Sequence, residues 1–287
     1  MSLEIRAMVE TWPIEGSFVI SRGARTQAEV VLAEVSDGTH TGRGECVPYA
    51  RYSETVDGVI SDIENARLED TDRQALRALL PPGAARNALD CALWDLHAKQ
   101  TGTRVAAACG YASAHPVETA YTLSLGTPEA MAEAARTAAH RPLLKLKLGG
   151  DGDAERILAV RAAAPEARIV VDANEAWTAE NCIANLRACA QARIALIEQP
   201  MKAGDDELLR DIPHVAPICA DESVHVVGDL ERRTGKYDAV NVKLDKAGGL
   251  TEALELVSEA RKRGYLIMVG CMLGTSLAMA PAVILAQ

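Results

Sequence analysis

Five charged side chains recur at nearly regular steps in the second half of the chain. From Lys147, the steps to Asp172, Glu198, Asp221 and Lys243 are 25, 26, 23 and 22 residues. Each of the five ends a short apolar stretch with the length of a β-strand. Parallel strands joined by helices can close into a (β/α) barrel. The carboxyl ends of its strands then meet at one rim, where the active sites of these barrels lie. We therefore expect the five side chains to converge on one site.

Three of the five side chains are carboxylates on successive strands: Asp172, Glu198 and Asp221. Three oxygen donors with no Cys or His nearby suit a hard cation, so the sequence predicts a Mg²⁺ site that would also accept Mn²⁺. The alternative is that three unrelated acids each cap the helix after their strand. Matched positions in three successive repeats favour the metal site.

Two lysines flank the carboxylates, Lys147 on the second strand of this region and Lys243 on the sixth. In an eight-stranded barrel these strands are opposite, so we expect one lysine to remove a proton from a carbon and the other to return one to its opposite face. The metal would stabilise the enediolate that forms when the carbon next to a carboxylate loses its proton. Lys145 points to the same face as Lys147, and we expect it to hold the substrate carboxylate and to lower the pKa of Lys147. Lys246 is predicted to be a rim lysine whose ammonium reaches solvent.

The elements that carry these residues alternate strictly between strand and helix from residue 117 onward. Amphipathic helices are predicted between the strands, for example over 128–139 and 250–263. An open doubly wound sheet is the alternative, but no G-x-G-x-x-G sequence follows the first strand, so a parallel (β/α) barrel is favoured. The predicted strands cover residues 117–125, 143–148, 168–174, 194–199, 217–222, 238–244 and 265–270.

The first part of the chain has a different pattern, which predicts a small α+β unit. We therefore expect two domains, an α+β domain over residues 1–110 and a barrel domain over residues 111–287. In the first domain we predict strands over 5–12 and 28–36, a Gly-rich turn over 42–45, and helices over 56–66 and 84–100.

The composition narrows the class of protein. Of 287 residues, 48% are hydrophobic and 24% are charged, which is typical of a soluble globular chain. A net charge of -10 argues against a nucleic-acid partner. Seven scattered cysteines without a C-x-x-C pair argue against a zinc ribbon and a disulfide framework. We expect a cytoplasmic enzyme with a small-molecule substrate and no membrane partner, and leave a homo-oligomer open.

The sequence around these side chains resembles the enolase superfamily, and within it the muconate-lactonising branch. The resemblance covers nearly the whole chain and is greatest for the dipeptide epimerases. It is carried by Lys145-Leu146-Lys147, Asp172-Ala173-Asn174, Ile197-Glu198-Gln199-Pro200, Ala220-Asp221-Glu222-Ser223 and Asn241-Val242-Lys243, and by the stretches 84–95, 171–177, 241–250 and 270–273.

The resemblance implies a modified (β/α)7β barrel with an N-terminal capping domain. It implies an isomerase that epimerises L-Ala-D/L-Glu or a similar dipeptide in murein (peptidoglycan) recycling, with Mg²⁺, by two-lysine 1,1-proton transfer through an enediolate. An N-succinylamino acid racemase, an o-succinylbenzoate synthase or a cycloisomerase on the same scaffold remains an alternative. A non-catalytic binding protein is disfavoured, because both lysines and all three carboxylates are retained.

The resemblance also implies which residues contact the substrate. The loop 21–25 is expected to close over it, so that Arg22 or Arg25 pairs with a distal carboxylate; two solvated loop arginines are the alternative. A second cap loop with Tyr49 and Ser53 is expected to help exclude water. The residues expected to line the pocket are Thr122, Asn174, Met272, Leu273 and Thr275.

One feature of the family is missing from the sequence. The resemblance implies an eighth strand with a D-x-D motif that binds the free ammonium group of the dipeptide. No D-x-D occurs downstream of Gly270. We therefore expect the barrel of this chain to be incomplete at its C-terminal side.

Overall fold

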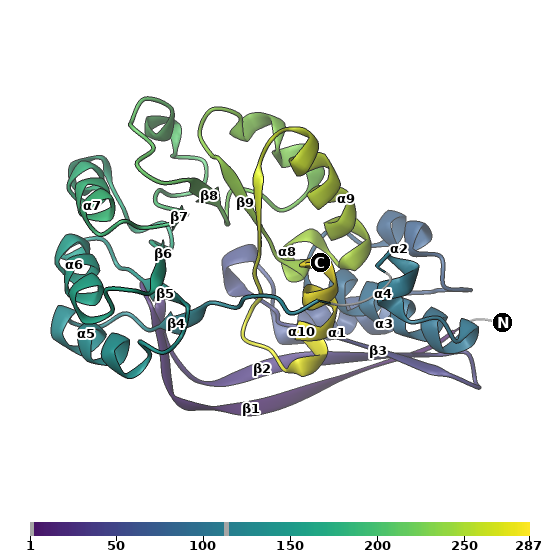
Figure 1. Ribbon diagram of the computed structural model, residues 1–287. Helices are drawn as coiled ribbons and strands as arrows, with labels where there is room; N and C mark the ends of the chain where they lie inside the picture. Colours follow the sequence, from purple (N-terminus) through teal and green to yellow (C-terminus); the bar gives the residue numbers. More distant parts are fainter. Residues whose placement is uncertain (1–2, 112–114) are drawn as a thin grey trace.

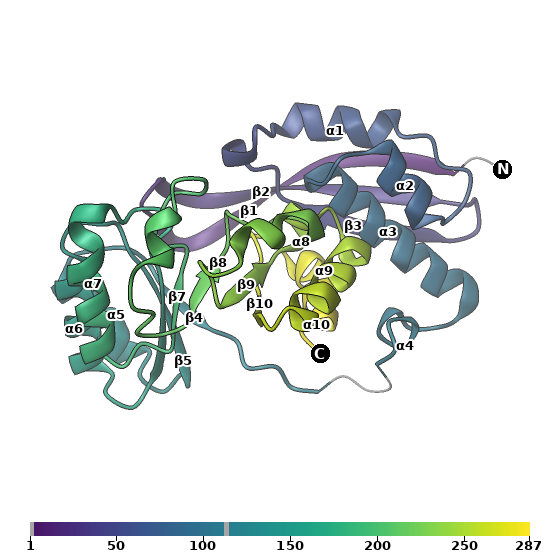
Figure 2. The same ribbon diagram turned by 90° about the horizontal axis from the view of Figure 1, so that it is seen from above.

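The computed structural model describes residues 3–111 and 115–287, which form a cap domain and a barrel domain (Figure 1). In the cap domain, three antiparallel strands in the order β1-β2-β3 pack against helices on one side (Figure 2). Its strands are β1 (Glu4–Ile20), β2 (Gly23–Ser36) and β3 (Thr41–Cys46), and its helices are the 3-10 helix η1 (Ala50–Tyr52) and α1 (Val56–Asn65), α2 (Arg73–Leu79), α3 (Ala84–Thr101) and α4 (Val105–Ala108).

The predicted Gly-rich turn over residues 42–45 is wrong, because these residues belong to strand β3. The glycines serve close packing instead of a turn. A Cβ on Gly42 would lie 2.0 Å from the carbonyl oxygen of Ala92, and a Cβ on Gly44 would lie 2.0 Å from that of Ala88. Helix α3 therefore lies directly on the backbone of β3, which only glycine permits.

Strands β1 and β2 are longer than predicted and form a hairpin that extends from the cap domain to the barrel domain (Figure 1). The far end of β1 is tied to the segment that follows β4. The backbone N–H of Leu125 donates to the carbonyl of Val19 at 3.1 Å. The hairpin turn, which contains Arg22, is thereby held beside the rim of the barrel domain.

Within the described residues 115–287, the barrel domain contains seven parallel strands in the order β10-β9-β8-β7-β6-β5-β4, which confirms the predicted parallel (β/α) arrangement. They curl into an open sheet with β4 and β10 at its edges (Figure 1). The strands are β4 (Tyr121–Leu123), β5 (Leu143–Lys147), β6 (Arg168–Asp172), β7 (Leu196–Glu198), β8 (Ile218–Ala220), β9 (Ala239–Val242) and β10 (Leu266–Val269). The helices are α5 (Pro128–Thr137), α6 (Asp153–Ala163), α7 (Ala179–Gln191), α8 (Leu244–Ala247), α9 (Leu250–Lys262) and α10 (Ser276–Leu285), with 3-10 helices η2 (Glu207–Arg210), η3 (Val227–Asp229) and η4 (Glu231–Arg233).

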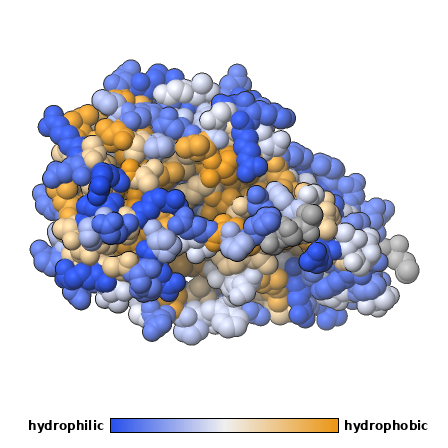
Figure 3. Space-filling model, viewed as in Figure 1, coloured by the Kyte–Doolittle hydropathy of each residue, from blue (hydrophilic) through white to orange (hydrophobic). Residues whose placement is uncertain are grey.

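Apolar surface is visible at the centre of the face shown in Figure 3. Leu266 of the edge strand β10 is 56% exposed, and Val283 of α10 is 45% exposed.

Within the described ranges, no helix is both long and apolar enough to cross a membrane.

Alternation along β5 separates its lysines from its apolar residues. Leu144 and Leu146 are fully buried in the core that β5 shares with α5 and α6. Side chains of successive strand residues point to opposite faces, so Lys145 and Lys147 point to the inside of the curled sheet. The leucines thus pack against the helices, and the ammonium groups point to the inside of the sheet.

Helix α3 also joins the two domains. Arg86 donates from Nη2 to the carbonyl of Ala247 at 2.7 Å, and Trp94 donates from Nε1 to Thr251 Oγ1 at 3.0 Å. The boundary between residues 110 and 111 stays a prediction, because the neighbouring residues 112–114 lie outside the described ranges.

Candidate active site

The five charged residues that were predicted to converge lie at or just beyond the carboxyl ends of five neighbouring strands. Lys147 is paired in register with Asp172, and Asp172 with Glu198. Asp221 follows β8, and Lys243 follows β9. Their side chains form two groups of ion pairs, one around Asp172 and one around Asp221, so the predicted residues lie together at one rim of the sheet.

Lys145 and Lys147 both lie against Asp172. Their Nζ atoms are 2.9 and 2.6 Å from the same oxygen, Asp172 Oδ2. Lys145 Nζ is also 2.5 Å from Glu198 Oε2. The ammonium group of Lys145 therefore bridges two of the three carboxylates, and the predicted common face of the two lysines is confirmed.

Asp221 lies between two other lysines. Its Oδ2 is 2.5 Å from Lys243 Nζ, and its Oδ1 is 2.8 Å from Lys246 Nζ. The prediction that Lys246 is a rim lysine is wrong: this residue is only 2% exposed. Its ammonium group can be buried because carbonyl oxygens and a carboxylate surround it. The sequence does not reveal these partners, because most of them are backbone atoms.

Burial and neighbouring charges shift the pKa values of the two flanking lysines in opposite directions. Burial lowers the pKa of Lys147 below its ordinary value despite the attraction of Asp172, and the charge of Lys145 adds to the lowering. Burial acts in the same direction on Lys243, but Asp221 and other carboxylates outweigh it and hold the pKa of Lys243 well above its ordinary value. Lys147 is thus the more readily deprotonated of the two.

The three carboxylates fit a hard divalent cation. They offer only oxygen donors, and Asp172, Glu198 and Asp221 are at most 1% exposed. Glu198 Oε2 and Asp221 Oδ1 accept no hydrogen bond of regular geometry from the described residues, although each contacts a lysine. Among the described residues, no three Asp, Glu, His or Cys side chains are arranged so that they could hold a metal ion as they stand. At this site, the ammonium group of Lys145 lies between two of the carboxylates. These oxygens are ligands of the kind that Mg²⁺ prefers.

Two amide side chains that the sequence reading gave no role hold the carboxylates in place. Asn241 of β9 donates from Nδ2 to Glu198 Oε1 at 2.7 Å. Gln199, in the left-handed region with φ 34°, accepts the backbone N–H of Asp221 on Oε1 at 2.8 Å. Both residues lie inside the quoted sequence motifs, which was the only signal that could have identified them.

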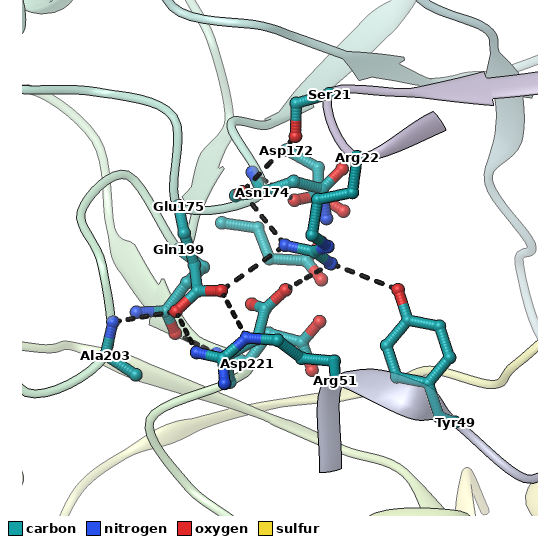
Figure 4. Close-up of polar contacts among 12 residues, drawn as sticks. Ser21, Arg22, Tyr49, Arg51, Asp172, Asn174, Glu175, Gln199, Ala203 and Asp221 are labelled. Atoms are coloured by element: carbon teal, nitrogen blue, oxygen red, sulfur yellow. Dashed lines mark hydrogen bonds and ion pairs between the residues drawn. The ribbon is translucent and has the colours of Figure 1, made fainter. Parts of the chain in front are cut away.

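The predicted cap-loop arginine Arg22 lies at the site, but its partners are carboxylates of the chain itself (Figure 4). Its Nη2 is 2.8 Å from Glu222 Oε1 and its Nη1 is 3.3 Å from Glu175 Oε2. Nη1 also donates to the carbonyl of Asn174 at 3.0 Å. Burial acts to lower the pKa of Arg22, but Glu222 and Tyr49 outweigh it and raise the pKa. Arg22 is therefore a charged link between the cap loop and the rim.

Glu175 joins a second cap loop to the same rim, a role that the sequence reading missed. Arg51 donates from Nε and Nη2 to the two Glu175 oxygens at 3.0 and 2.9 Å (Figure 4). Glu175 Oε1 also accepts the backbone N–H of Ala203 at 2.8 Å. Because Arg51 and Glu175 are 124 residues apart, only the folded chain brings them together.

The remaining predicted pocket residues lie in different surroundings. Arg25 lies 5.7 Å above the ring of Tyr49, and both belong to the cap loops. Thr122 is the neighbour of Lys145 in the sheet register. Thr275 caps α10 and donates from its backbone N–H to Glu45 Oε1 at 2.7 Å, so it faces the cap domain. Asn174, which was predicted to bind substrate, is buried, and its backbone N–H donates to Asp172 Oδ1 at 3.0 Å.

The other predicted loop residues lie at the edges of this region. Met272 and Leu273 follow β10 and are partly buried, whereas Ser53 is exposed and has a left-handed φ of 63°. Phe18, the single phenylalanine of the chain, has its ring 5.9 Å from Lys147 Nζ. The ring comes from β1 of the cap domain and contributes apolar surface next to the lysine.

Comparison with known families gives two matches that together span most of the chain. Residues 2–110 match the N-terminal domain of the mandelate racemase / muconate lactonizing enzyme family, and residues 129–287 match the enolase C-terminal domain-like family. Among curated proteins, the chain is 45% identical over 283 residues to the L-Ala-D/L-Glu epimerase of Escherichia coli strain K12, covering 97% of this chain and 88% of the relative. It is 43% identical over 263 residues to the N-acetyl-D-glutamate racemase of a Pseudoalteromonas species, covering 90% and 83%.

Solved structures resemble the whole fold. A member of the enolase family from Agrobacterium tumefaciens, with homology to dipeptide epimerases and with bound sodium and L-Ala-L-Glu, is 52% identical with a TM-score of 0.95, covering 99% of this chain and 88% of that one. A dipeptide epimerase from Cytophaga hutchinsonii, complexed with Mg and D-Ala-L-Val, is 27% identical with a TM-score of 0.91, covering 99% and 82%.

Proposed function

This chain belongs to the mandelate racemase / muconate lactonizing enzyme family of the enolase superfamily, and from that premise we propose that it is a dipeptide epimerase whose preferred substrate is L-Ala-D/L-Glu. One observation carries the proposal. Three buried carboxylates end successive parallel strands, and a lysine is held against the carboxylate at each end of the row, Lys147 at Asp172 and Lys243 at Asp221.

The lysines carry the chemistry of the reaction. Lys147, with its lowered pKa, accepts the proton from the α-carbon of one isomer, and Lys243, which holds its proton, delivers one to the other face. In the reverse direction their roles exchange. Lys145 contributes a positive charge beside Lys147 that attracts the substrate carboxylate.

Asp172, Glu198 and Asp221 would hold Mg²⁺, or Mn²⁺ in its place, and structural relatives have been solved with Mg. When bound, the cation supplies positive charge that stabilises the enediolate produced by loss of the α-proton. With a cation at these carboxylates, the ammonium groups that contact them here would be available to the substrate.

The side-chain carboxylate of the substrate is expected to bind Arg22. This arginine is fixed over the rim by two carboxylates of the chain, and the substrate carboxylate would replace one of them as its partner. Arg25 is the second candidate, because its guanidinium lies on the same cap loop over Tyr49. Thr122, Met272 and Thr275 remain proposed contacts of the pocket.

We assign the reaction to the recycling of murein peptides in the cytoplasm. The relative from Escherichia coli acts, by its name, on L-Ala-D/L-Glu, the dipeptide for which the sequence resemblance implies a role in murein recycling. Seven free cysteines are in keeping with a reducing compartment.

A second function on the same residues is the racemisation of an N-acylated amino acid. The relative that is named an N-acetyl-D-glutamate racemase is almost as similar to this chain as the epimerase is. Both substrates have a free carboxylate next to the exchanging carbon and an acidic side chain. They differ at the amino end, where the dipeptide has an ammonium group and the acylated amino acid has none.

Proton NMR in D₂O with Mg²⁺ separates the two functions. The protein is mixed with L-Ala-L-Glu, L-Ala-D-Glu, other alanyl dipeptides, N-acetylglutamate and N-succinylamino acids in separate samples. Loss of the α-proton signal together with appearance of the other diastereomer of Ala-Glu supports the epimerase. If the α-proton of N-acetylglutamate or of an N-succinylamino acid exchanges faster than that of Ala-Glu, the protein is a racemase of acylated amino acids instead.

A further inference from the structure

Lys246 carries a charge that the interior of the protein has to compensate. It is among the largest fully buried side chains of the described part of the chain, with only 2% of the residue exposed. Transfer of an unpaired ammonium group from water to such a place is strongly unfavourable. The residue lies in α8, one helical turn after Lys243. It is therefore close to the active site.

Four oxygen atoms surround the ammonium group of Lys246. It donates to the carbonyl oxygens of Asp221, Val224 and Asn241, the latter two at 2.9 and 3.1 Å. The fourth oxygen is Asp221 Oδ1 at 2.8 Å. Three carbonyl oxygens and one carboxylate oxygen are also the ligands expected around a small bound cation. Here the cation is the ammonium group of Lys246.

This oxygen cage includes one side-chain oxygen of Asp221. Oδ1 lies against Lys246 and Oδ2 against Lys243, while Gln199 accepts the Asp221 backbone N–H. Rotation of the carboxylate would break both ion pairs, because each oxygen has its own ammonium partner. The carbonyl bonds also connect the loop after β8 to the end of β9, so that the strands bearing Asp221 and Lys243 keep their spacing.

We propose that Lys246 is a positioning residue of the active site, whose caged ammonium group fixes the rotamer of Asp221 and thereby its alignment as a metal ligand and as the partner of Lys243. The inference deepens the proposed function and rests on it, because Asp221 is a metal ligand there. The competing explanation is a purely structural one, in which Lys246 connects two loops and contributes only to stability.

Replacement of Lys246 by methionine tests the proposal. Lys246→Met keeps the length of the side chain and removes the charge. Isothermal calorimetry with Mg²⁺ alone should show an affinity about 10–100-fold weaker than that of the unchanged protein, the range found when a residue that supports a metal ligand is lost. Lys262→Met on α9, a lysine whose side chain is 70% exposed, is the matched control and should bind Mg²⁺ with unchanged affinity.

A second variant guards against loss of folding. Lys246→Arg keeps the positive charge, but the planar guanidinium does not match a cage built around a tetrahedral ammonium group. We expect it to fold and to bind Mg²⁺ more weakly than the unchanged protein. If either variant is folded by circular dichroism and binds Mg²⁺ with unchanged affinity, the proposal is overturned, even if its thermal unfolding temperature is lower. Unfolding of both variants also overturns it, because the role of Lys246 would then be structural.

The same samples distinguish this inference from the proposed function. If the unchanged protein epimerises no dipeptide while Lys246→Met still loses affinity for Mg²⁺, the proposed function fails and the positioning of Asp221 stands. If the unchanged protein epimerises Ala-Glu and Lys246→Met does so with unchanged kcat and Mg²⁺ affinity, the positioning role fails and the function stands.

Discussion

Asp245 of the barrel domain accepts the backbone N–H of Val47 of the cap domain on Oδ1, at 2.9 Å. The same oxygen accepts a hydrogen bond from Asn87 of α3 at 3.1 Å. Burial raises the pKa of Asp245 to about 6, although both hydrogen bonds act to lower it. A carboxyl group that holds the two domains together is therefore close to its point of protonation at neutral pH.

This contact predicts how stability changes with pH. The pKa of Asp245 is higher in the folded than in the unfolded protein, so the folded state binds the proton more tightly. The free energy of unfolding should therefore fall as the pH rises from about 4 to about 6, by roughly 3 kcal/mol for a shift of about two pKa units. Asp245→Asn, which resembles the protonated acid, should remove this part of the pH dependence. Denaturant unfolding between pH 4 and pH 7.5 measures it.

Asp62→Asn, an exposed position on α1, is the control for that experiment and should unfold with the same pH dependence as the unchanged protein. A pH profile of Asp245→Asn that runs parallel to that of the unchanged protein would show that Asp245 is ionised normally in the folded state.

Neutral replacements of the carboxylates test the metal site. Asp172→Asn, Glu198→Gln and Asp221→Asn each remove one charged ligand, so each should weaken Mg²⁺ binding by at least about 10–100-fold and reduce epimerisation in parallel. Titration calorimetry measures the affinity, and the exposed Asp211→Asn serves as the control. Unchanged affinity in all three variants would mean that the cation binds elsewhere.

The link between cap loops and rim predicts a change in substrate binding. Glu175→Gln removes the charge that holds Arg22 and Arg51, so the loops around both should open more often. We expect KM for Ala-Glu to rise several-fold with a smaller change in kcat, because Glu175 touches neither lysine. Arg51→Lys, which keeps the charge but loses the two-pronged contact, should have a smaller effect. A fall in kcat with unchanged KM would contradict this role.

The arrangement of the site was predictable from sequence because it depends on a repeat. Parallel strands joined by helices place equivalent positions at one rim, so the spacing from Lys147 to Lys243 was sufficient to bring those residues together. The Lys145 and Lys147 pair followed from the alternation of side chains along a strand. Neither argument needs a contact between distant segments.

The errors and omissions concern contacts that no local pattern encodes. Lys246 looked like a rim lysine because its oxygen partners are mostly backbone carbonyls, which have no signature in the sequence. Gly42 and Gly44 were interpreted as a turn, since their real partner, the backbone of α3, is more than forty residues away. Glu175 and Arg51 come from different domains.

Removal of one lysine tests the two-base mechanism most directly. A single base would have to release, rotate and reprotonate its substrate on one face, which does not invert a carbon efficiently. In this chain the two candidate bases lie at different carboxylates, Lys147 at Asp172 and Lys243 at Asp221, on strands four apart in the sheet order. Each should therefore serve one stereoisomer.

Lys147→Ala and Lys243→Ala should each abolish net epimerisation in both directions, because each direction needs both groups, with a loss of at least ~10²–10⁴-fold. Yet each variant should still exchange the α-proton of one isomer with solvent through the lysine that remains, and the two variants should favour opposite isomers. Proton NMR in D₂O separates the two events, since exchange removes the α-proton signal and inversion creates the signals of the other diastereomer. Lys262→Ala, on the exposed surface of α9, should leave both events unchanged. If Lys243→Ala inverted Ala-Glu at a nearly normal rate, the second base would lie elsewhere, and the pairing of Lys243 with Asp221 would be structural.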